Sequence, residues 1–161
     1  MNDDEGHSGR ELLVVWHSKT GNTHRLLEAV LRGARHPELA AVRVRALHAF
    51  DAGPADLLAA DGLLLGTPEN FGYMSGAMKD FLDRTYYEVE GRLAPLPYSI
   101  FVSAGNDGSG AVREIRRIAK GYPFVEVQEP VIVRGEVDAD GLERCETLGM
   151  ALAAGLDAGI Y

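Results

Sequence analysis

The stretch from Leu12 to Val30, "LLVVWHSKTGNTHRLLEAV", has the pattern from which the fold of this chain can be predicted. Its first part, Leu12 to Trp16, is an apolar run without alternation, which is typical of a strand buried on both faces. After Asn22 the apolar residues recur with the 3.6-residue period of an amphipathic helix. A polar turn, Ser18 to Thr23, connects the two. The stretch therefore predicts a buried strand that leads through a polar loop into a helix.

The same alternation of strand and helix continues along the chain. Further strands are expected at Val42–Leu47, Leu63–Leu65, Tyr98–Val102 and Val131–Val133, and further helices at Pro54–Ala60, Met74–Thr85, Val112–Ala119 and Leu142–Leu156. Strands separated by helices need crossover connections, which produce a parallel sheet with helices on both faces. We therefore predict an α/β protein with a doubly wound, five-stranded parallel sheet. A single domain over residues 11–161 would follow a disordered polar tail over residues 1–10.

The composition disfavours several classes of protein. The chain of 161 residues has a net charge of −8, and such a surface repels the phosphate backbone of nucleic acids. No apolar stretch approaches the roughly 20 residues that cross a bilayer, and the acidic start does not resemble a secretory signal. The single cysteine, Cys145, falls at an apolar helical position and fits a reducing compartment. We expect a cytoplasmic protein with no membrane span and no nucleic-acid partner.

One local group of residues is basic, although the chain as a whole is acidic. It consists of Arg113, Arg116, Arg117 and Lys120. Their spacing is that of one helix face, and charged faces of this kind are usually solvated. We interpret the group as an exposed helix surface.

Three loops form the candidate binding site, because ligands of doubly wound sheets bind beyond the carboxyl ends of the strands. They are Ser18–Thr23, Thr67–Tyr73 and Ala104–Gly110. The first combines hydroxyl groups, an amide and Gly21 with a helix N-terminus, whose free N–H groups and dipole favour an anion such as a phosphate monoester. The same residues would also serve as an ordinary helix cap, and the sequence leaves both interpretations open.

Other motifs do not fit the first loop. A nucleotide-triphosphate loop places Lys directly after its second glycine, whereas Lys19 precedes the only glycine here. Ser18 lacks the G-x-S-x-G turn of a hydrolase nucleophile, and Cys145 lies too far along the chain for a phosphatase loop. His17 and His24 bracket the loop without metal-ligand spacing. We expect no metal site.

The second and third loops have the residues to hold a flat ring. Phe71 and Tyr73 lie on a tight loop after a strand, where aromatic groups can cover a ring, although they would also suit packing over the next helix. The third loop, "SAGNDGSG" from Ser103 to Gly110, is small and polar, and it would either close the other side of the ring or cap the following helix. A ring and a phosphate together suggest a nucleotide-like cofactor.

With these motifs the sequence resembles the flavodoxin-like superfamily, and within it the WrbA-type and NAD(P)H-dependent FMN reductase branch. "SKTGNT", Ser18 to Thr23, resembles the phosphate loop for FMN. "GTPENFGYMSGAMKDFLDRT", Gly66 to Thr85, is closely similar to the G-T-P-x-x-F-G-x-M-x-x-x-M-K-x-F-L-D segment of that branch and is the more specific motif. The chain departs from the WrbA-type pattern at Glu69 and Asn70, which precede the Phe-Gly pair, and in the third loop, which lacks a histidine.

The resemblance implies a flavodoxin-like sheet of strand order 2-1-3-4-5 that binds FMN non-covalently. The phosphate would be held by Ser18, Lys19, Thr20, Gly21, Asn22 and Thr23. The isoalloxazine would be lined by Thr67, Pro68, Glu69, Asn70, Phe71, Gly72 and Tyr73, and contacted on its far side by Ala104, Gly105, Asn106, Asp107 and Gly108. The flavin itself performs the redox chemistry in this family, so no catalytic side chain is expected.

The function implied is that of an oxidoreductase that passes electrons from NAD(P)H through FMN to a small acceptor such as a quinone. By resemblance alone, a homodimer is expected. An alternative is a flavodoxin-like carrier of single electrons between protein partners, which the small size and acidic surface suit. A third interpretation is an interaction module of the same fold that has lost the cofactor.

Overall fold

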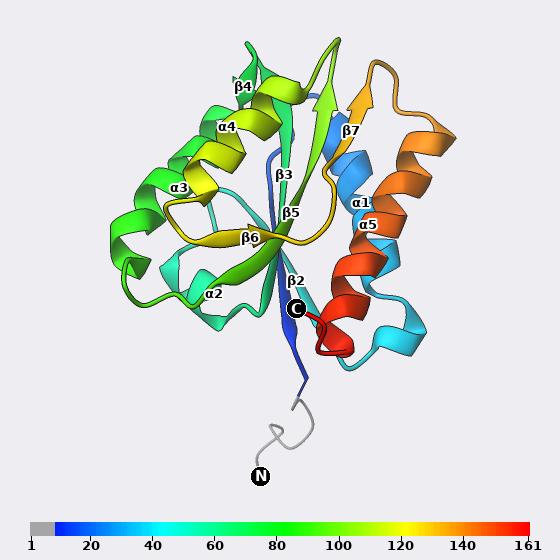
Figure 1. The fold of residues 1–161 in the computed structure, drawn as a ribbon. Coiled ribbons are helices and arrows are strands. Elements are labelled where there is room, and N and C mark those ends of the chain that lie inside the picture. Colours follow the sequence, from blue (N-terminus) through cyan, green and yellow to red (C-terminus); the bar gives the residue numbers. More distant parts are fainter. Residues whose placement is uncertain (1–8) are drawn as a thin grey trace.

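A parallel sheet forms the centre of the computed structural model, which describes residues 9–161 (Figure 1). The strands are β1 (Glu11–Trp16), β2 (Arg43–His48), β3 (Gly62–Asn70), β4 (Tyr73–Met74), β5 (Leu96–Ala104), β6 (Phe124–Glu126) and β7 (Val131–Arg134). They lie in the order β2-β1-β3-β5-β6, with β4 paired to β3 and β7 paired to β5. The disordered tail predicted for residues 1–10 falls almost entirely outside the described residues.

The predicted strand order 2-1-3-4-5 is confirmed, with one correction at the last position. Both β6 and β7 pair in parallel with the edge of β5 that faces away from β3, in the registers Leu96↔Phe124 and Phe101↔Val131. Residues 127–130 leave the sheet between them. The expected fifth strand is therefore divided into two short strands.

Helices cover both faces of the sheet. They are α1 (Asn22–Ala34), α2 (Pro54–Ala59), α3 (Gly76–Val89), α4 (Ser109–Ala119) and α5 (Ala139–Asp157), with one 3₁₀ turn at Pro37–Leu39. Helices α1 and α5 pack on one face, and α2, α3 and α4 cover the other (Figure 1). Leu13 and Val15 of β1 belong to the core under α2 to α4, and Leu12 and Val14 belong to the core under α1 and α5. This two-sided burial explains why β1 has no polar alternation.

Two glycines let α1 and α5 approach each other closely. A Cβ atom on Gly33 would lie 1.9 Å from the carbonyl oxygen of Glu146, and one on Gly149 would lie 2.0 Å from the carbonyl oxygen of Val30. Any larger residue at these positions would therefore force the two helices apart.

The start of the third helix differs from the prediction. Met74 was expected in the helix, but it lies in β4, and α3 begins at Gly76. The side chain of Ser75 accepts a hydrogen bond from the N–H of Met78 at 3.3 Å and so caps the helix. Met74 is nevertheless buried, which is why its apolar side chain continues the helical stripe in the sequence.

Candidate functional site

The three predicted loops lie at one end of the sheet, where β1, β3 and β5 finish (Figure 1). They are Ser18–Thr23, Thr67–Tyr73 and Ala104–Gly110, and the last two residues of the first and third loops already belong to α1 and α4. Neighbouring parallel strands end on the same side, so residues 80 positions apart in the chain meet there. The role of each of these residues in binding stays a prediction.

The first loop is closed by the side chain of Ser18. Its hydroxyl accepts hydrogen bonds from the N–H groups of Gly21 and His24, each at 3.2 Å. Gly21 has a φ of 101° and precedes α1 without any side-chain cap of its own. The N–H groups of Asn22 and Thr23, in the first turn of α1, have no intrahelical partner, and no acidic residue lies in that turn. The loop therefore presents free donors and a positive helix end to an anion.

The side chain of Thr23 is not available to a ligand in the same way. It is buried, and its hydroxyl lies 2.7 Å from the hydroxyl of Ser103 at the end of β5. This hydrogen bond connects the first loop to the strand that carries the third loop. Of the predicted phosphate residues, Lys19, Thr20, Gly21 and Asn22 are exposed.

The second loop is a tight β-hairpin. Asn70 of β3 pairs with Tyr73 of β4, so that only Phe71 and Gly72 form the turn. Their φ angles of 53° and 70° are both positive, which is the pattern of a type I′ turn. Below the turn, the buried hydroxyl of Thr67 donates to the carbonyl of Pro68 at 2.8 Å. Phe71 is fully exposed at the tip of the hairpin.

The third loop is joined to this hairpin by the side chain of Glu69. One carboxylate oxygen accepts a hydrogen bond from the N–H of Gly108 at 2.9 Å. The other accepts from the N–H groups of Gly110 at 3.0 Å and Ala111 at 3.2 Å. Glu69 therefore points to the N-terminus of α4, where its negative charge meets the positive end of the helix.

Close backbone packing supports the same contact. A Cβ atom on Gly110 would lie 2.1 Å from the carbonyl oxygen of Gly72, and one on Gly108 would lie 2.4 Å from the side chain of Ile132. Gly108 also has a φ of 88° at the start of α4. The hairpin, the third loop and β7 are thus in van der Waals contact at this end of the sheet.

In the third loop, Gly105, Asn106 and Asp107 are exposed, while Ala104 and Gly108 are buried. Hydrogen bonds from the side chain and N–H of Ser109 lower the pKa of the Asp107 carboxyl. The exposed segment is therefore polar and anionic near neutral pH.

A cluster of aromatic and imidazole rings next to the first loop was not predicted from the sequence. It consists of Trp16, His17, His24, His48 and Phe50, whose neighbouring ring centroids lie 5.1–6.5 Å apart. Burial, then His48 and Lys19, lower the pKa of His17. Within the described part of the chain, the Nδ1 atom of His17 is buried without a hydrogen-bond partner. The spacing of these residues gave no signal, because they come from β1, β2, α1 and the segments that follow the two strands.

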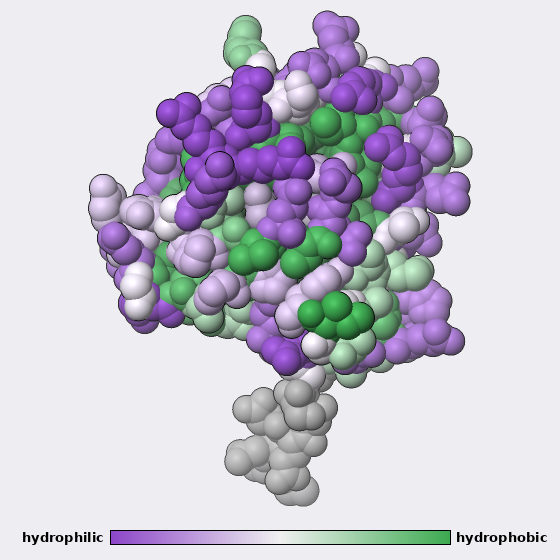
Figure 2. Space-filling view, in the orientation of Figure 1, coloured by the Kyte–Doolittle hydropathy of each residue, from purple (hydrophilic) through white to green (hydrophobic). Residues whose placement is uncertain are grey.

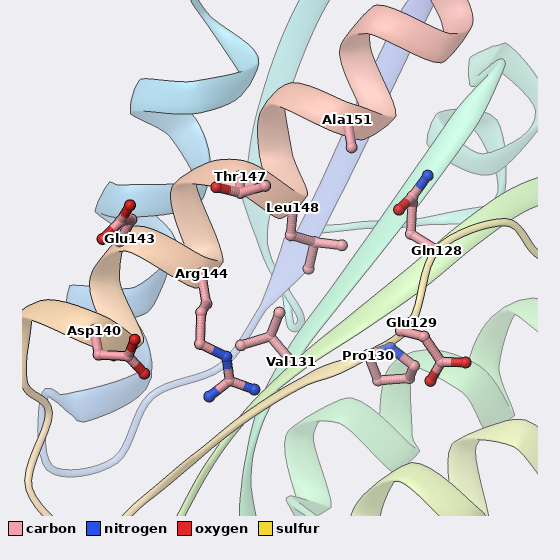
Figure 3. Close-up of a pocket in the computed structure, with 10 residues that line it drawn as sticks. All are labelled: Gln128, Glu129, Pro130, Val131, Asp140, Glu143, Arg144, Thr147, Leu148 and Ala151. Carbon is pink, nitrogen blue, oxygen red and sulfur yellow. The ribbon is translucent and has the colours of Figure 1, made fainter.

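A cleft of about 430 Å³ lies elsewhere, between α5 and the segment that separates β6 from β7 (Figure 3). Arg144 reaches from α5 toward Val131 and donates to the carbonyl of Ile132 at 3.2 Å. None of the predicted site residues lines this cleft. The cleft lies where the chain leaves the sheet between β6 and β7, and it is separate from the three loops.

The basic residues of α4 are exposed, as predicted, and hydrophilic groups cover the region of this helix in the space-filling view (Figure 2). Arg116 forms a two-pronged pair with the Glu126 carboxylate, at 2.8 and 2.9 Å. Cys145 is buried, and burial raises the pKa of its thiol to about 12. No helix among residues 9–161 has the length and apolar character to span a bilayer, and no group of three or more metal-ligating side chains gathers there.

One protein-family model matches most of the chain. The model of the NADPH-dependent FMN reductase family matches residues 13–137, from β1 through β7, and so includes all three loops. The chain belongs to this family. The strand order described above is that of a flavodoxin-like fold.

Two relatives and one solved structure illustrate the similarity. The chain is 38% identical over 104 residues to a flavodoxin of Aquifex aeolicus, covering 62% of this chain and 53% of the relative. It is 38% identical over 118 residues to an NAD(P)H dehydrogenase (quinone) of Acidithiobacillus ferrooxidans, covering 62% of this chain and 59% of the relative. The crystal structure of a WrbA-like flavodoxin protein from Agrobacterium tumefaciens superimposes with a TM-score of 0.71 at 23% identity, over 91% of this chain and 96% of that one. The chain thus spans less than two thirds of the length of the two relatives.

The residues at the three loops fit FMN, the group that this family implies. The first loop offers unpaired N–H groups and no acidic residue in the first turn of α1, which suits a phosphate monoester. A Cβ atom on Gly21 would have nothing within 4 Å, so the backbone there is open to a ligand. The hairpin presents Phe71 and the half-buried Tyr73 at the same end of the sheet. Both parts of FMN, the phosphate and the ring, therefore have residues of matching chemistry.

Proposed function

We propose that this chain is an FMN-dependent oxidoreductase that binds FMN non-covalently and passes electrons from NAD(P)H to a small acceptor such as a quinone. The observation that carries the proposal is the first loop, where free N–H groups at the start of α1 face the end of the sheet that also bears the other two loops. Family membership supports the same activity.

The first loop would hold the phosphate of FMN. Asn22 and Thr23 would donate their N–H groups, and Thr20 would donate its exposed hydroxyl. The Ser18 hydroxyl accepts the N–H groups of Gly21 and His24 and so holds the loop in shape, and its own O–H would donate to the phosphate. Neutral donors at a helix N-terminus suit a phosphate monoester without a dedicated arginine.

The hairpin and the third loop would form the walls around the ring. Phe71 and Tyr73 would cover the ring, and the backbone of Gly105 and Asn106 would border its far side. Because Glu69 fastens the third loop to the hairpin, these two walls have a fixed separation before any ligand arrives.

When bound, FMN supplies the redox chemistry by accepting a hydride from NAD(P)H and passing the electrons to the acceptor. The side chains bind, orient and shield, and we assign no catalytic side chain. The exposed aromatic at the tip of the hairpin would help to exclude water once a second ring enters.

The test starts with purified full-length protein. Its absorption spectrum should show flavin bands, or the colourless protein should take up added FMN with saturation. The loaded protein should then oxidise NADH or NADPH when a quinone is supplied. If the protein binds FMN but oxidises neither NADH nor NADPH with any acceptor, the proposed enzymatic activity is refuted. If it does not bind FMN, the result favours a cofactor-free interaction module.

A second candidate function is that of an electron carrier between proteins. It is favoured by the net charge of −8 and by similarity to a protein named flavodoxin. Stepwise reduction distinguishes the two. A one-electron-reduced flavin that accumulates would support the carrier, whereas direct two-electron reduction would support the reductase.

The remaining assignments belong to the same proposal. We infer a cytoplasmic location from the acidic composition and the single buried cysteine. We also propose a homodimer, in which a second copy would complete the surroundings of the ring beside the exposed Phe71.

A further inference from the structure

The carboxylate of Glu69 caps the N-terminus of α4. It accepts hydrogen bonds from Gly108, Gly110 and Ala111 within 2.9–3.2 Å. Gly108, which precedes α4, supplies no side-chain cap, and the first turn of the helix contains no acidic residue. The only carboxylate that these N–H groups contact in the described structure therefore comes from the hairpin, about 40 positions earlier in the chain.

This contact has a mechanical and an electrostatic consequence. Mechanically, the three hydrogen bonds and the approach of Gly110 to the carbonyl of Gly72 join the second and third loops. Electrostatically, an uncapped helix N-terminus carries the equivalent of about half a positive charge. The carboxylate of Glu69 offsets that charge at the border of the proposed ring site, together with the carboxylate of Asp107, which accepts a hydrogen bond from the N–H of Ser109 at 3.3 Å.

We propose that Glu69 is a positioning residue of the flavin site, which holds the two walls of the ring together and keeps the midpoint potential of bound FMN low. The inference rests on the proposed function. Two-electron reduction of bound FMN would place negative charge on the ring near neutral pH, and the positive end of α4 would stabilise that charge. Because Glu69 offsets the helix end, it removes part of this stabilisation and favours transfer of electrons onward to the acceptor.

The decisive variant is Glu69→Gln, which keeps the length of the side chain but removes its charge and one of its acceptor atoms. We expect the midpoint potential of bound FMN to become more positive than in the wild type. We also expect the Kd for FMN to rise at least about tenfold, because hydrogen bonds to a charged group that fix the third loop are lost. The matched control is Glu114→Gln on α4, because among residues 9–161 Glu114 pairs only with its neighbour Arg113. It makes the same change of charge and should leave both values unchanged.

A second measurement tests the hydrogen bonds of Glu69 to the start of α4 in the protein without FMN. Amide hydrogen exchange at Gly110 and Ala111 should be faster in Glu69→Gln than in the wild type and in Glu114→Gln. If Glu69→Gln does not fold, Glu69→Asp takes its place, since it keeps the charge but is one methylene too short to reach all three N–H groups. Faster exchange and a Kd for FMN raised at least about threefold would then support the proposal, and wild-type values would overturn it.

The outcomes separate this inference from the proposed function. A wild-type protein that does not bind FMN refutes the proposed function, and the inference falls with it. A wild-type protein that binds FMN, with Glu69→Gln matching its potential, overturns only the inference. A shift in potential of the same size in Glu114→Gln would also overturn it, since net charge alone would then explain the effect.

Discussion

The hydroxyl of Thr23 lies 2.7 Å from the hydroxyl of Ser103, between two buried side chains that are 80 positions apart in the chain. Thr23 is in the first turn of α1, and Ser103 is near the end of β5. The bond therefore joins the first loop to the base of the third. Since Glu69 joins the second loop to the third, all three loops are connected through side chains as well as through the sheet.

The Thr23 to Ser103 hydrogen bond should contribute to stability. Replacing Thr23→Val leaves the Ser103 hydroxyl buried without this partner, which costs about 1–2 kcal/mol in the free energy of unfolding. Urea unfolding of the apo protein measures this loss of stability. The double variant with Ser103→Ala should lose less than the sum of the two single variants, because the second change removes the stranded hydroxyl. Strict additivity would show that the two groups do not interact.

The phosphate site can be tested by placing a charge in the first loop. Thr20→Asp puts an anion beside the proposed phosphate and should raise the Kd for FMN at least about tenfold by charge repulsion. Thr20→Asn, which is similar in size and neutral, is the control and should have a much smaller effect. Because an acidic residue near a helix N-terminus is favourable, Thr20→Asp should not lower the free energy of unfolding. Equal FMN affinity in Thr20→Asp and the wild type would contradict the assigned site.

The parts of the fold that are buried on both faces were predictable from the sequence. Leu12–Val15 of β1 and Leu63–Leu65 of β3 are apolar because each residue meets one layer of helices. Strand β6 escaped prediction because two of its three residues, Val125 and Glu126, are exposed at the sheet edge, so no apolar run marks it. Burial, and not strand formation itself, is what the sequence pattern reports.

The location of the candidate site was predictable for a different reason. Loops after parallel strands meet at one end of the sheet, so identifying the strands was sufficient. The contacts inside the site were not predictable. The lining of the ring by Glu69 stays a prediction, but the contact of its carboxylate with the start of α4 had no signal in the sequence, because it depends on the close approach of Gly110 to Gly72. The Thr23 to Ser103 bond likewise depends on how α1 packs against β5.

Phe71 in the turn should lower the free energy of unfolding, and its exposed ring should contribute to FMN binding. Its φ of 53° is unfavourable for a side chain of this kind, whereas Asn tolerates it well. We expect Phe71→Asn to raise the free energy of unfolding by up to about 1 kcal/mol and to weaken FMN binding at least about threefold. Tyr87→Asn, at an exposed aromatic residue near the far end of α3, is the control for FMN binding. Unchanged affinity in Phe71→Asn would limit Phe71 to the turn.

The contact between α1 and α5 should not tolerate an added methyl group. In Gly149→Ala the new Cβ would lie 2.0 Å from the carbonyl oxygen of Val30. The resulting overpacking costs about 1–3 kcal/mol, which exceeds the gain of up to about 1 kcal/mol from the better helix propensity of Ala. Thermal or urea unfolding measures the balance. In the control Gly76→Ala, at the start of α3, no atom lies within 4 Å of the new Cβ, and stability should be equal or slightly higher.

The imidazole of His17 should make the apo protein less stable in mild acid. Burial, with His48 and Lys19, lowers its pKa in the folded state below 6.5, so the unfolded chain binds more protons in this range. The stabilisation that neutral His17 gives to the folded state is therefore fully present above pH 6.5. It is lost as the pH falls through the lowered pKa. Between about pH 7.5 and 5.5, the wild type should lose more stability than His17→Gln, with His48→Gln intermediate because one cause of the shift is removed. Identical pH dependence in the wild type and His17→Gln, followed by urea unfolding at each pH, would show that His17 does not contribute.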